Sequence, residues 1–372
     1  MLGSVEDPVG DDNGPGTYTY PTGSFDLTGL DVYRDGDLVR FVVAMGGEIH
    51  NPWGGSGMST LEAAVVNEEL GRGIAPSPHF GSTVIGAGVL LRGGTDEQQQ
   101  AWLPGIAAGT TILGVAWLEP KGGFGAKGIR TTATPDGDGF RLDGTKWHAA
   151  YASSADRLVV PARTGDGPDD IDLFLVDRTA DGVTLTQQFT IASDTQYQVE
   201  LTGVRVAAAD RIGTGGTGWQ AFEATLLEGI VLLAAQAVGG AQYALDITVQ
   251  YAKDREQFDK PLGAFQAISH YLADAATAVN GARTLVYEAA WAQSEGRSIA
   301  SLAPMAKLFA CQTFRDVTAM AQQVFGGVGF TLEYDIQLYF RRAKQLQLSW
   351  WNDRYLEELV AHQVLDEREV VG

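Results

Sequence analysis

The residues of this chain most able to do chemistry are one arginine and a group of glutamines and glycines in its C-terminal half. An arginine supplies a fixed positive charge, glutamine amides donate and accept hydrogen bonds, and glycine lets a ligand approach the backbone closely. A nucleotide diphosphate uses all three. Taken singly, an arginine at a helix end or a glycine pair between helices is more often purely architectural, so both interpretations stay open. The group consists of Arg255, Gln257, Gln266, Gln323, Gly326 and Gly327.

A long helix is predicted immediately before this group. Apolar residues recur three and four positions apart over residues 230–252, which favours a helix of more than about five turns that buries one face. Gln236, Gln242 and Asp246 interrupt the apolar run before it reaches the ~20 residues that cross a bilayer. The helix is therefore not expected to span a membrane.

Further helices are predicted after a turn. Residues 260–263, Lys-Pro-Leu-Gly, break the helical pattern, because proline has no N–H and glycine permits a turn. The pattern resumes over residues 265–276, 282–294 and 301–325. Together with the long helix, these segments predict a four-helix bundle.

The middle of the chain, residues 116–215, predicts a small β-domain. Short β-rich runs are separated by glycine, Asp-Gly and serine clusters, which is the pattern of strands joined by tight turns. Strands are expected over residues 171–176, 183–189 and 200–206, and the glycine-rich turn 213–218 ends the region.

Residues 58–115 predict two or three helices. Ser59 and Glu62 form the S-x-x-E pattern of a capping box, and an apolar stripe follows over residues 60–70. Gly71 can end this helix, because glycine is the residue most often found just beyond a helix C-terminus.

Residues 1–57 form a β-rich segment without helical period. The stretches 26–33 and 38–44 alternate apolar and polar residues around Arg-Asp-Gly-Asp, which predicts a hairpin. An isolated hairpin with open edges is marginal in water unless it packs on something. The aspartates of this segment could bind calcium, although acidic turn residues are more often only solvated.

Two motifs in the C-terminal half carry a family resemblance: REQFDKPLGAFQAISH over residues 255–270 and QVFGGVGFT over residues 323–331. With the middle stretch, they make the chain similar to the acyl-CoA dehydrogenase family over about residues 58–366. The resemblance implies an α+β flavoprotein with N-terminal helices, a central β-domain and a C-terminal four-helix bundle over residues 216–372. It implies FAD as the cofactor, and it makes residues 58–115 a truncated form of the family's N-terminal helical domain.

The resemblance also assigns residues to the cofactor. In the family, the arginine and phenylalanine of the R-x-Q-F motif and the glutamine before Gly-Gly reach the FAD of a neighbouring subunit, while residues of the β-domain flank the flavin ring. Trp147 has a second interpretation, as a tryptophan of the sheet core. The expected cofactor contacts are Trp117, Leu118, Trp147, Arg255, Phe258, Gln266, Gln323, Gly326 and Gly327.

The implied reaction is α,β-dehydrogenation of an acyl-CoA thioester, in which a carboxylate removes the α-proton and the flavin accepts a hydride. Family members supply this carboxylate from one of two positions, and the chain has a glutamate at neither. Gln236 stands at the first position and Trp350 at the second. Glu228 lies on the same helix face as Gln236, but about 12 Å away, which is too far to substitute.

Other departures weaken the expected flavin site. Leu118 and Phe124 stand where the family has a threonine and a serine, so a hydroxyl is lost at each position, and Ala149 stands where it has another threonine. Asp259 places an anion beside the expected diphosphate, which is unfavourable.

Three functions therefore remain open. The first is a FAD-dependent acyl-CoA dehydrogenase with a displaced base, and the second is a non-catalytic subunit of a heteromer. The third is a recombined chain, because residues 7–55 resemble the start of the C-terminal module of glucodextranase-type secreted enzymes, a β-sandwich associated with carbohydrate or surface binding. This resemblance implies that residues 1–57 are a fragment of such a sandwich. For the first two, the expected partners are acyl-CoA, an electron-transfer flavoprotein or similar acceptor, and further subunits in a homomeric or heteromeric dimer or tetramer.

The composition argues against several classes of binding partner and site. The 372 residues include 46 acidic and 26 basic side chains, and the resulting net charge of −20 argues against binding to nucleic-acid backbones or anionic membranes. The N-terminus has no positively charged leader with an apolar core, from which a cytoplasmic location is expected. The five histidines show no metal-ligand spacing, so no metal site is expected, and Cys311 is the only cysteine.

Overall fold

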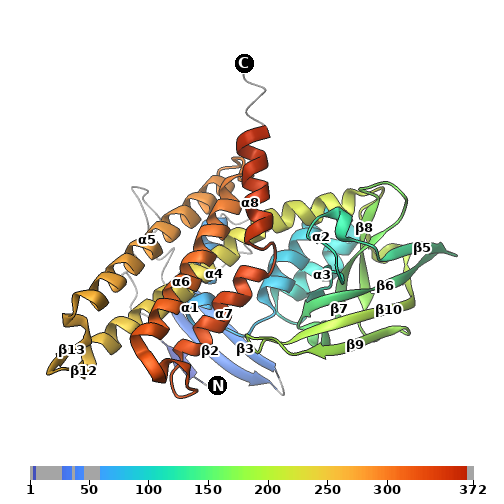
Figure 1. Cartoon of the computed structure of the whole chain (residues 1–372). Coiled ribbons are helices and arrows are strands. Elements are labelled where there is room, and N and C mark those ends of the chain that lie inside the picture. The colour runs from blue at the N-terminus through green and yellow to red at the C-terminus, as the bar shows by residue number, and fades with distance from the viewer. Residues whose placement is uncertain (1–2, 6–26, 36–37, 46–58, 367–372) are drawn as a thin grey trace.

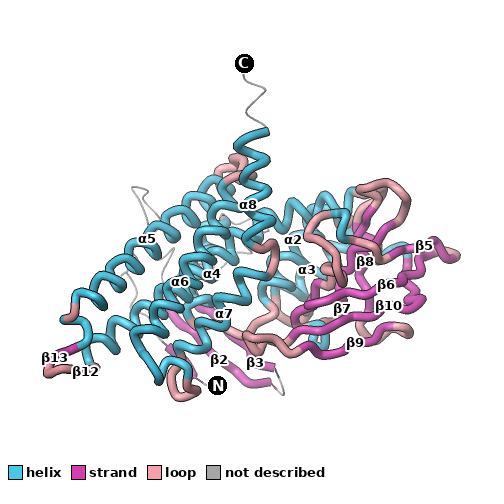
Figure 2. The backbone as a smooth tube through the Cα atoms, viewed as in Figure 1, coloured by secondary structure: helices cyan, strands magenta, loops and turns pink. Residues whose placement is uncertain are grey.

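The computed structural model describes residues 3–5, 27–35, 38–45 and 59–366 (Figure 1). From residue 59 onward the chain runs from short helices through a sheet to long helices, as the sequence predicts. Figure 2 shows the long helices and the main sheet at opposite ends of the molecule, the segregation expected of an α+β fold.

The elements follow in this order along the chain. The helices are α1 (Thr60–Arg72), a π-helical turn (Phe80–Gly86), α2 (Ala87–Gly93), α3 (Asp96–Ala107), α4 (Thr217–Asp254), α5 (Gln266–Ser294), α6 (Leu302–Phe325), α7 (Ile336–Leu348) and α8 (Asp353–Ala361). The strands are β1 (Gly3–Val5), β2 (Leu27–Asp35), β3 (Leu38–Met45), β4 (Leu113–Val115), β5 (Thr132–Asp136), β6 (Gly139–Ala150), β7 (Arg157–Arg163), β8 (Ile171–Asp177), β9 (Val183–Gln188), β10 (Gln196–Ala207), β11 (Arg211–Ile212), β12 (Glu256–Gln257) and β13 (Lys260–Pro261).

Helix α1 begins as the sequence predicts but ends later. The Ser59 hydroxyl accepts a hydrogen bond from the backbone N–H of Leu61 at 3.2 Å, and the Glu62 carboxylate accepts one from the backbone N–H of Ser59 at 2.6 Å. This is the predicted capping box. The prediction that Gly71 ends the helix is wrong, because α1 continues through it and is capped by Gly73.

Gly71 is needed inside α1 because the backbones of α1 and α4 touch there. A Cβ atom at Gly71 would overlap the backbone oxygen of Gln236, and one at Gly239 would overlap the backbone oxygen of Glu68. Two glycines, one on each helix, therefore allow an approach that no larger residue permits. This crossing fixes the position of Gln236 relative to α1.

The sheet is built into the helical core. Its strand order is β11-β8-β7-β5-β6-β10-β9, with β4 parallel to β7. The strands predicted over residues 171–176, 183–189 and 200–206 correspond to β8, β9 and part of β10. Strand β7 is buried on both faces, because Leu158 packs in the core of the sheet while Val159 packs in the core shared with the helices. The sheet is thus held firmly against α4.

The bundle differs from the sequence prediction in one helix. The sequence predicts two separate helices over residues 265–276 and 282–294. This prediction is wrong, because α5 is a single helix of 29 residues. Gly281 weakens the local helix propensity, but no proline interrupts the segment, and Val279 and Ala282 on either side are each only 1% exposed. Packing therefore outweighs propensity. The fourth helix of the bundle is the shorter α7, which packs on α4 and α6.

Helix α4 is the core of the bundle. It has 38 residues, and within the described part of the chain it is the one helix long and apolar enough to cross a membrane. Its most apolar stretch is 72% buried inside the structure, where it packs against α1, α5 and α6. The burial explains the apolar sequence, and the prediction that this helix belongs to a bundle is confirmed.

The predicted N-terminal hairpin is observed as far as the structure describes it. Strands β2 and β3 pair antiparallel, with Asp35 opposite Leu38, and β1 pairs with β2. The possible calcium site and the predicted sandwich fragment concern residues that lie mostly outside the described ranges.

The α1–α4 contact predicts that Gly71→Ala destabilises the protein. The new methyl group would force the two helix backbones apart, so we expect the free energy of unfolding to fall by about 2 kcal/mol or more in denaturant titrations. Gly73→Ala is the matched control, because a Cβ atom there meets its nearest neighbour at an ordinary 3.7 Å. Equal stability of the two variants would contradict the proposed backbone contact.

Candidate active site

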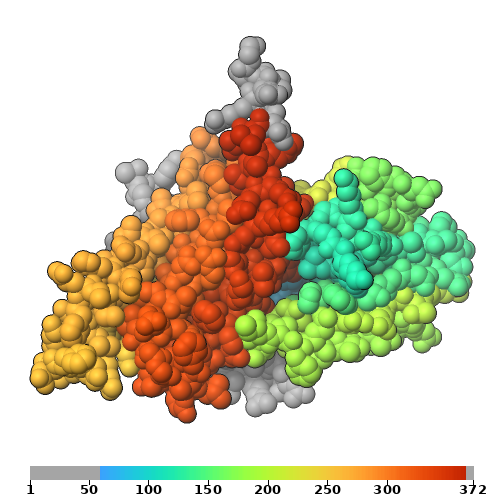
Figure 3. All heavy atoms as spheres, in the orientation of Figure 1, coloured from blue at the N-terminus to red at the C-terminus, as the bar shows by residue number. Residues whose placement is uncertain are grey.

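A cavity of about 380 Å³ lies where the sheet meets the helices. The seam between the C-terminal helices and the sheet crosses the face of the molecule shown in Figure 3. Phe189, Ile191 and Leu348 line the cavity with side chains that are 95%, 55% and 53% exposed, and they mark its mouth. Leu113 and Leu233 line it from the buried core, so the cavity reaches from the surface to α4.

One wall of the cavity is aromatic. Trp350 stacks on Trp117 with ring centroids 5.7 Å apart, and Phe80 meets Trp350 edge-on at 5.0 Å. Trp350 and Trp351 both have positive φ, 52° and 74°, a conformation that costs a bulky residue of order 1–3 kcal/mol. The turn after α7 is therefore held in place by its surroundings. Trp350 stands at the second position where a base is expected, and it contributes a flat apolar surface instead.

Lys307 holds this turn from inside the bundle. Its side chain is fully buried on α6, and its ammonium donates hydrogen bonds to the backbone oxygens of Leu346 at 3.2 Å and Trp351 at 2.8 Å. Burial lowers the pKa of Lys307 below its usual value. The side chain thus ties the end of α7 to the strained turn that carries Trp350.

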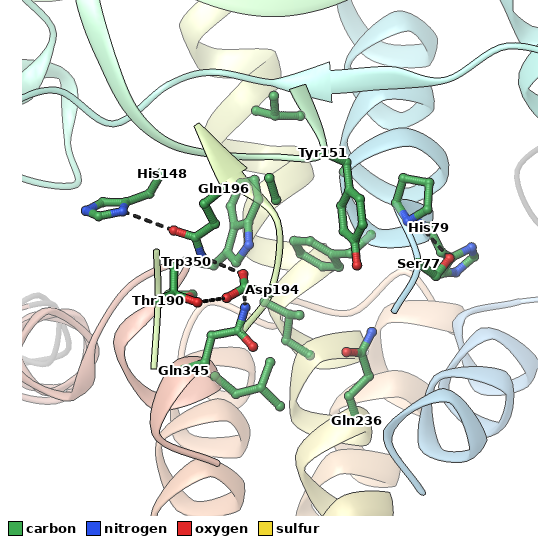
Figure 4. A pocket seen from close by; sticks show the side chains of 18 of the residues that line it. Ser77, His79, His148, Tyr151, Thr190, Asp194, Gln196, Gln236, Gln345 and Trp350 are labelled. Atoms are coloured by element: carbon green, nitrogen blue, oxygen red, sulfur yellow. Dashed lines mark hydrogen bonds between the residues drawn. The ribbon is translucent and has the colours of Figure 1, made fainter. Parts of the chain in front are cut away.

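Asp194 joins the sheet to α7 beside the cavity (Figure 4). Its carboxylate accepts hydrogen bonds from the amides of Gln196, at 2.6 Å, and Gln345, and from the hydroxyl of Thr190. The Gln196 oxygen lies 3.0 Å from Nδ1 of His148. Among the described residues that line the cavity, Asp194 is the only carboxylate. Its oxygens accept hydrogen bonds from these three donors and thereby connect the two walls of the cavity.

Gln236 faces the cavity from α4, on the side opposite Asp194 (Figure 4). Its Nε2 donates a hydrogen bond to Oδ1 of Asn67 on α1 at 2.8 Å, and the Asn67 amide donates to the backbone oxygen of Ala63 at 2.8 Å. Asn67 is 1% exposed. The residue at the first expected base position is thus a neutral amide in a fixed orientation.

The expected flavin contacts on the sheet lie close together. Trp117 and Leu118 line the cavity, and the backbone N–H of Trp147 donates to the Leu118 oxygen at 2.8 Å. Trp147 is 36% exposed on β6, and its indole N–H donates to Gln198 at 2.9 Å. The interpretation of Trp147 as a sheet-core residue is therefore wrong.

Buried charges fix the segment that carries Leu118. The Glu119 carboxylate accepts hydrogen bonds from the Lys146 ammonium at 2.6 Å and from the backbone N–H of Thr131 at 3.0 Å. Burial alone would raise the pKa of Glu119, but the charge and hydrogen bond of Lys146, together with the hydrogen bonds from Thr131, outweigh it and hold that pKa below its usual value. Burial lowers the pKa of Lys146 to about 8. The segment is thereby rigid next to the cavity.

The remaining predicted contacts form a second group at the far end of α4. All of them are exposed, and the stacking of Tyr251 on Phe325 at 4.2 Å brings the two halves of the group together. Gln236 and Arg255 are separated by about 28 Å along the helix, so one chain does not bring both groups to one site. This second group consists of Arg255, Phe258, Gln266, Gln323, Gly326 and Gly327.

Both groups fit a dinucleotide cofactor. The side chains of Arg255, Gln266 and Gln323 have no hydrogen-bonding partner among the described residues, and a Cβ atom at Gly326 or Gly327 would meet nothing within 4 Å. These are free donors beside open backbone, as a diphosphate requires. At the cavity, Oε1 of Gln345 is buried without a partner. Asp259, next to Phe258, adds an unfavourable negative charge beside this group.

Two histidines line the cavity, but no metal site is found among the described residues. Burial lowers the pKa of His79 to about 4, so its imidazole is neutral near neutral pH. Sequence reasoning missed Asn67, Tyr151 and Asp194 as cavity or support residues. Only the Ser-Asp-Thr stretch around Asp194 offered a local signal, since the other two are brought to the cavity by tertiary packing.

Family comparisons cover nearly the whole chain. Models of the acyl-CoA dehydrogenase N-terminal, middle and C-terminal domains match residues 44–110, 114–204 and 216–364. A model of the "C-terminal binding-module, SLH-like, of glucodextranase" matches residues 2–67. The two kinds of match overlap over residues 44–67.

Individual proteins agree with these models. The chain is 34% identical to the probable acyl-CoA dehydrogenase YngJ of Bacillus subtilis, over 86% of this chain and 87% of that protein. It is 33% identical to the caffeyl-CoA reductase-Etf complex subunit CarC of Acetobacterium woodii, over 77% and 78% of the two chains. Its structure is similar to that of butyryl-CoA dehydrogenase from Megasphaera elsdenii, with a TM-score of 0.80 and 30% identity over 85% and 86% of the two chains.

The lowered pKa of His79 predicts a stability loss in mild acid. The folded protein keeps the imidazole neutral down to about pH 4, whereas the unfolded chain protonates it near pH 6.5, so stability is complete above pH 6.5 and falls as the pH drops towards 4. The loss from this residue amounts to at most about 3 kcal/mol. We expect His79→Gln to flatten the dependence of the melting temperature on pH, while His270→Gln, on the exposed surface of α5, leaves it unchanged. Parallel curves for wild type and His79→Gln would refute the assignment.

Proposed function

Because this chain belongs to the acyl-CoA dehydrogenase family, we propose that it binds FAD and an acyl-CoA thioester in the cavity between the sheet and the bundle, and that it oxidises the thioester only slowly. One observation carries the proposal: Gln236, at the expected base position, lines the cavity from α4. An amide has essentially no basicity near neutral pH, so the α-proton has no acceptor there.

Different residues of the chain serve different parts of the bound ligands. When bound, FAD supplies the acceptor for the hydride that leaves the β-carbon. Trp117 and Trp350 provide an apolar wall that excludes water from the thioester. The Asp194 network keeps the sheet at a fixed distance from α7, and the α1–α4 crossing keeps Gln236 pointed at the acyl group. Substrate positioning is therefore intact although the base is missing.

A second candidate function is that of a non-catalytic subunit. It is favoured because neither base position carries a carboxylate. The only carboxylate among the described cavity residues, Asp194, accepts hydrogen bonds from three donors. The relative CarC is named as a subunit of a complex with an Etf. In this case the chain would bind acyl-CoA or FAD only together with a catalytic partner chain.

The two separated groups of cofactor contacts predict an oligomer that shares FAD between subunits. Arg255 and Gln323 of one subunit would complete the nucleotide site of its neighbour, so we expect a dimer or a dimer of dimers whose flavin content depends on association. Sedimentation velocity with detection at the flavin absorbance measures both properties. A monomer that retains stoichiometric FAD would contradict the shared site.

The neutral amide at position 236 predicts that Gln236→Glu increases dehydrogenation. The substitution is nearly isosteric and supplies a carboxylate, so we expect the rate with an artificial electron acceptor to rise by about tenfold or more. Burial and the facing Asn67 oxygen would raise the pKa of the new carboxyl, so the gain should increase with pH. Gln250→Glu, on the exposed face of α4, is the control. Vigorous wild-type turnover that Gln236→Glu does not change would place the base elsewhere.

A further inference from the structure

The side-chain oxygen of Gln236 and the hydroxyl of Tyr151 have no hydrogen-bonding partner among the described residues, a property that they share in this cavity with Oε1 of Gln345 and Nε of Arg342. Figure 4 shows both side chains directed into the cavity, with the Tyr151 hydroxyl above the Gln236 amide. Both residues line the cavity. Neither belongs to the Asp194 network, whose hydrogen bonds are made by Thr190, Gln196 and Gln345.

The orientation of Gln236 follows from a backbone carbonyl on α1. The oxygen of Ala63 can only accept, so Asn67 must turn its amide NH2 towards it, at 2.8 Å. The Asn67 oxygen then faces Gln236 and can also only accept, so Gln236 must donate its NH2, at 2.8 Å. The Gln236 oxygen is therefore left for the cavity, where it presents a hydrogen-bond acceptor.

Tyr151 presents the complementary group. It follows the last residue of β6 with a φ of 56°, a left-handed conformation that is costly for a residue with a side chain and that recurs at functional sites. Its backbone N–H donates to the Thr195 oxygen at 2.9 Å, which holds the residue in place. Burial raises the pKa of Tyr151, against the opposing charge of Arg342, so the hydroxyl stays protonated and can donate.

The chemical nature of a bound acyl group determines whether these two atoms have a hydrogen-bonding partner in the complex. A plain alkyl chain would strip water from both and leave them unpaired, which is unfavourable. A hydroxyl on the acyl chain satisfies both at once, because it donates to the Gln236 oxygen and accepts from the Tyr151 hydroxyl. A carboxylate would meet the Gln236 oxygen with like polarity, although Arg342 also lines the cavity and could attract it.

We propose that the acyl-CoA thioester of this chain carries a neutral hydroxyl close to the thioester group, held between the Gln236 oxygen and the Tyr151 hydroxyl. This proposal rests on the proposed function, in which Gln236 faces the α-carbon. In this proposal, Gln236 does not accept a proton but recognises the substrate, so Gln236 and Tyr151 determine substrate specificity.

The test compares matched ligands by isothermal titration calorimetry. The FAD-loaded full-length protein, without an electron acceptor, is titrated with butanoyl-CoA and with each enantiomer of 3-hydroxybutanoyl-CoA. We expect one hydroxylated enantiomer to bind at least about tenfold more tightly than butanoyl-CoA, because a site with buried polar atoms rejects the analogue that lacks a partner for them.

Variants of Gln236 and Tyr151 test whether these two side chains cause the preference for the hydroxylated thioester. Gln236→Met keeps the length of the side chain but removes the acceptor, and Tyr151→Phe removes only the hydroxyl, so each should bring the ratio of the two dissociation constants towards one. Gln250→Met is the control on the same helix, where Gln250 is exposed and bonded to Asp254. Should Gln236→Met fail to fold, Tyr151→Phe alone decides.

The outcomes separate this inference from the proposed function. Equal or tighter binding of butanoyl-CoA overturns the hydroxyl site and leaves acyl-CoA binding intact. Tightest binding of glutaryl-CoA, added as a third ligand, assigns recognition to Arg342 and also overturns it. If no CoA thioester binds to the FAD-loaded protein, the proposed function fails and the inference fails with it.

Discussion

The backbone contact between α1 and α4 is the constraint on which the candidate site depends. Gly71 and Gly239 let the two helices approach until main chain meets main chain, and at that distance the side chain of Asn67 reaches Gln236. The hydrogen-bond chain from Ala63 then sets which end of the Gln236 amide enters the cavity. If the helices were further apart, the Gln236 amide would be free to rotate. The two glycines therefore determine that a hydrogen-bond acceptor faces the cavity.

The rest of the cavity is held by polar groups that serve structure. Lys307 fixes the strained turn of Trp350 and Trp351, Asp194 joins the sheet to α7, and Lys146 with Glu119 anchors the segment before β5. Each group is satisfied by direct partners, as buried polar atoms require. The walls are thus rigid, while the expected base positions carry an amide and an indole. The chain keeps the fold of the acyl-CoA dehydrogenase family and carries no carboxylate at either expected base position.

The sequence predicted the large features of the fold because they rest on periodicity and on motifs. The capping box at Ser59, the long α4 and the strands β8 to β10 all follow from local patterns. The errors arose where tertiary contacts outweigh local signals: Gly71 does not end α1, and Gly281 does not interrupt α5. In the candidate site, the motifs indicated both groups of residues that are proposed to contact the cofactor. The roles of Asn67 and Tyr151 depend on contacts between segments far apart in the chain, which no local pattern reports.

The most direct test of the account is a structure of the protein with FAD and an acyl-CoA analogue that cannot be oxidised. The account predicts that the acyl group fills the cavity between the sheet and α4, with the atom equivalent to the α-carbon within about 4 Å of the Gln236 side chain. It also predicts that Arg255 and Gln323 of a neighbouring subunit contact the cofactor. An acyl group bound elsewhere, or a carboxylate of this chain closer to the α-carbon than Gln236, would contradict it.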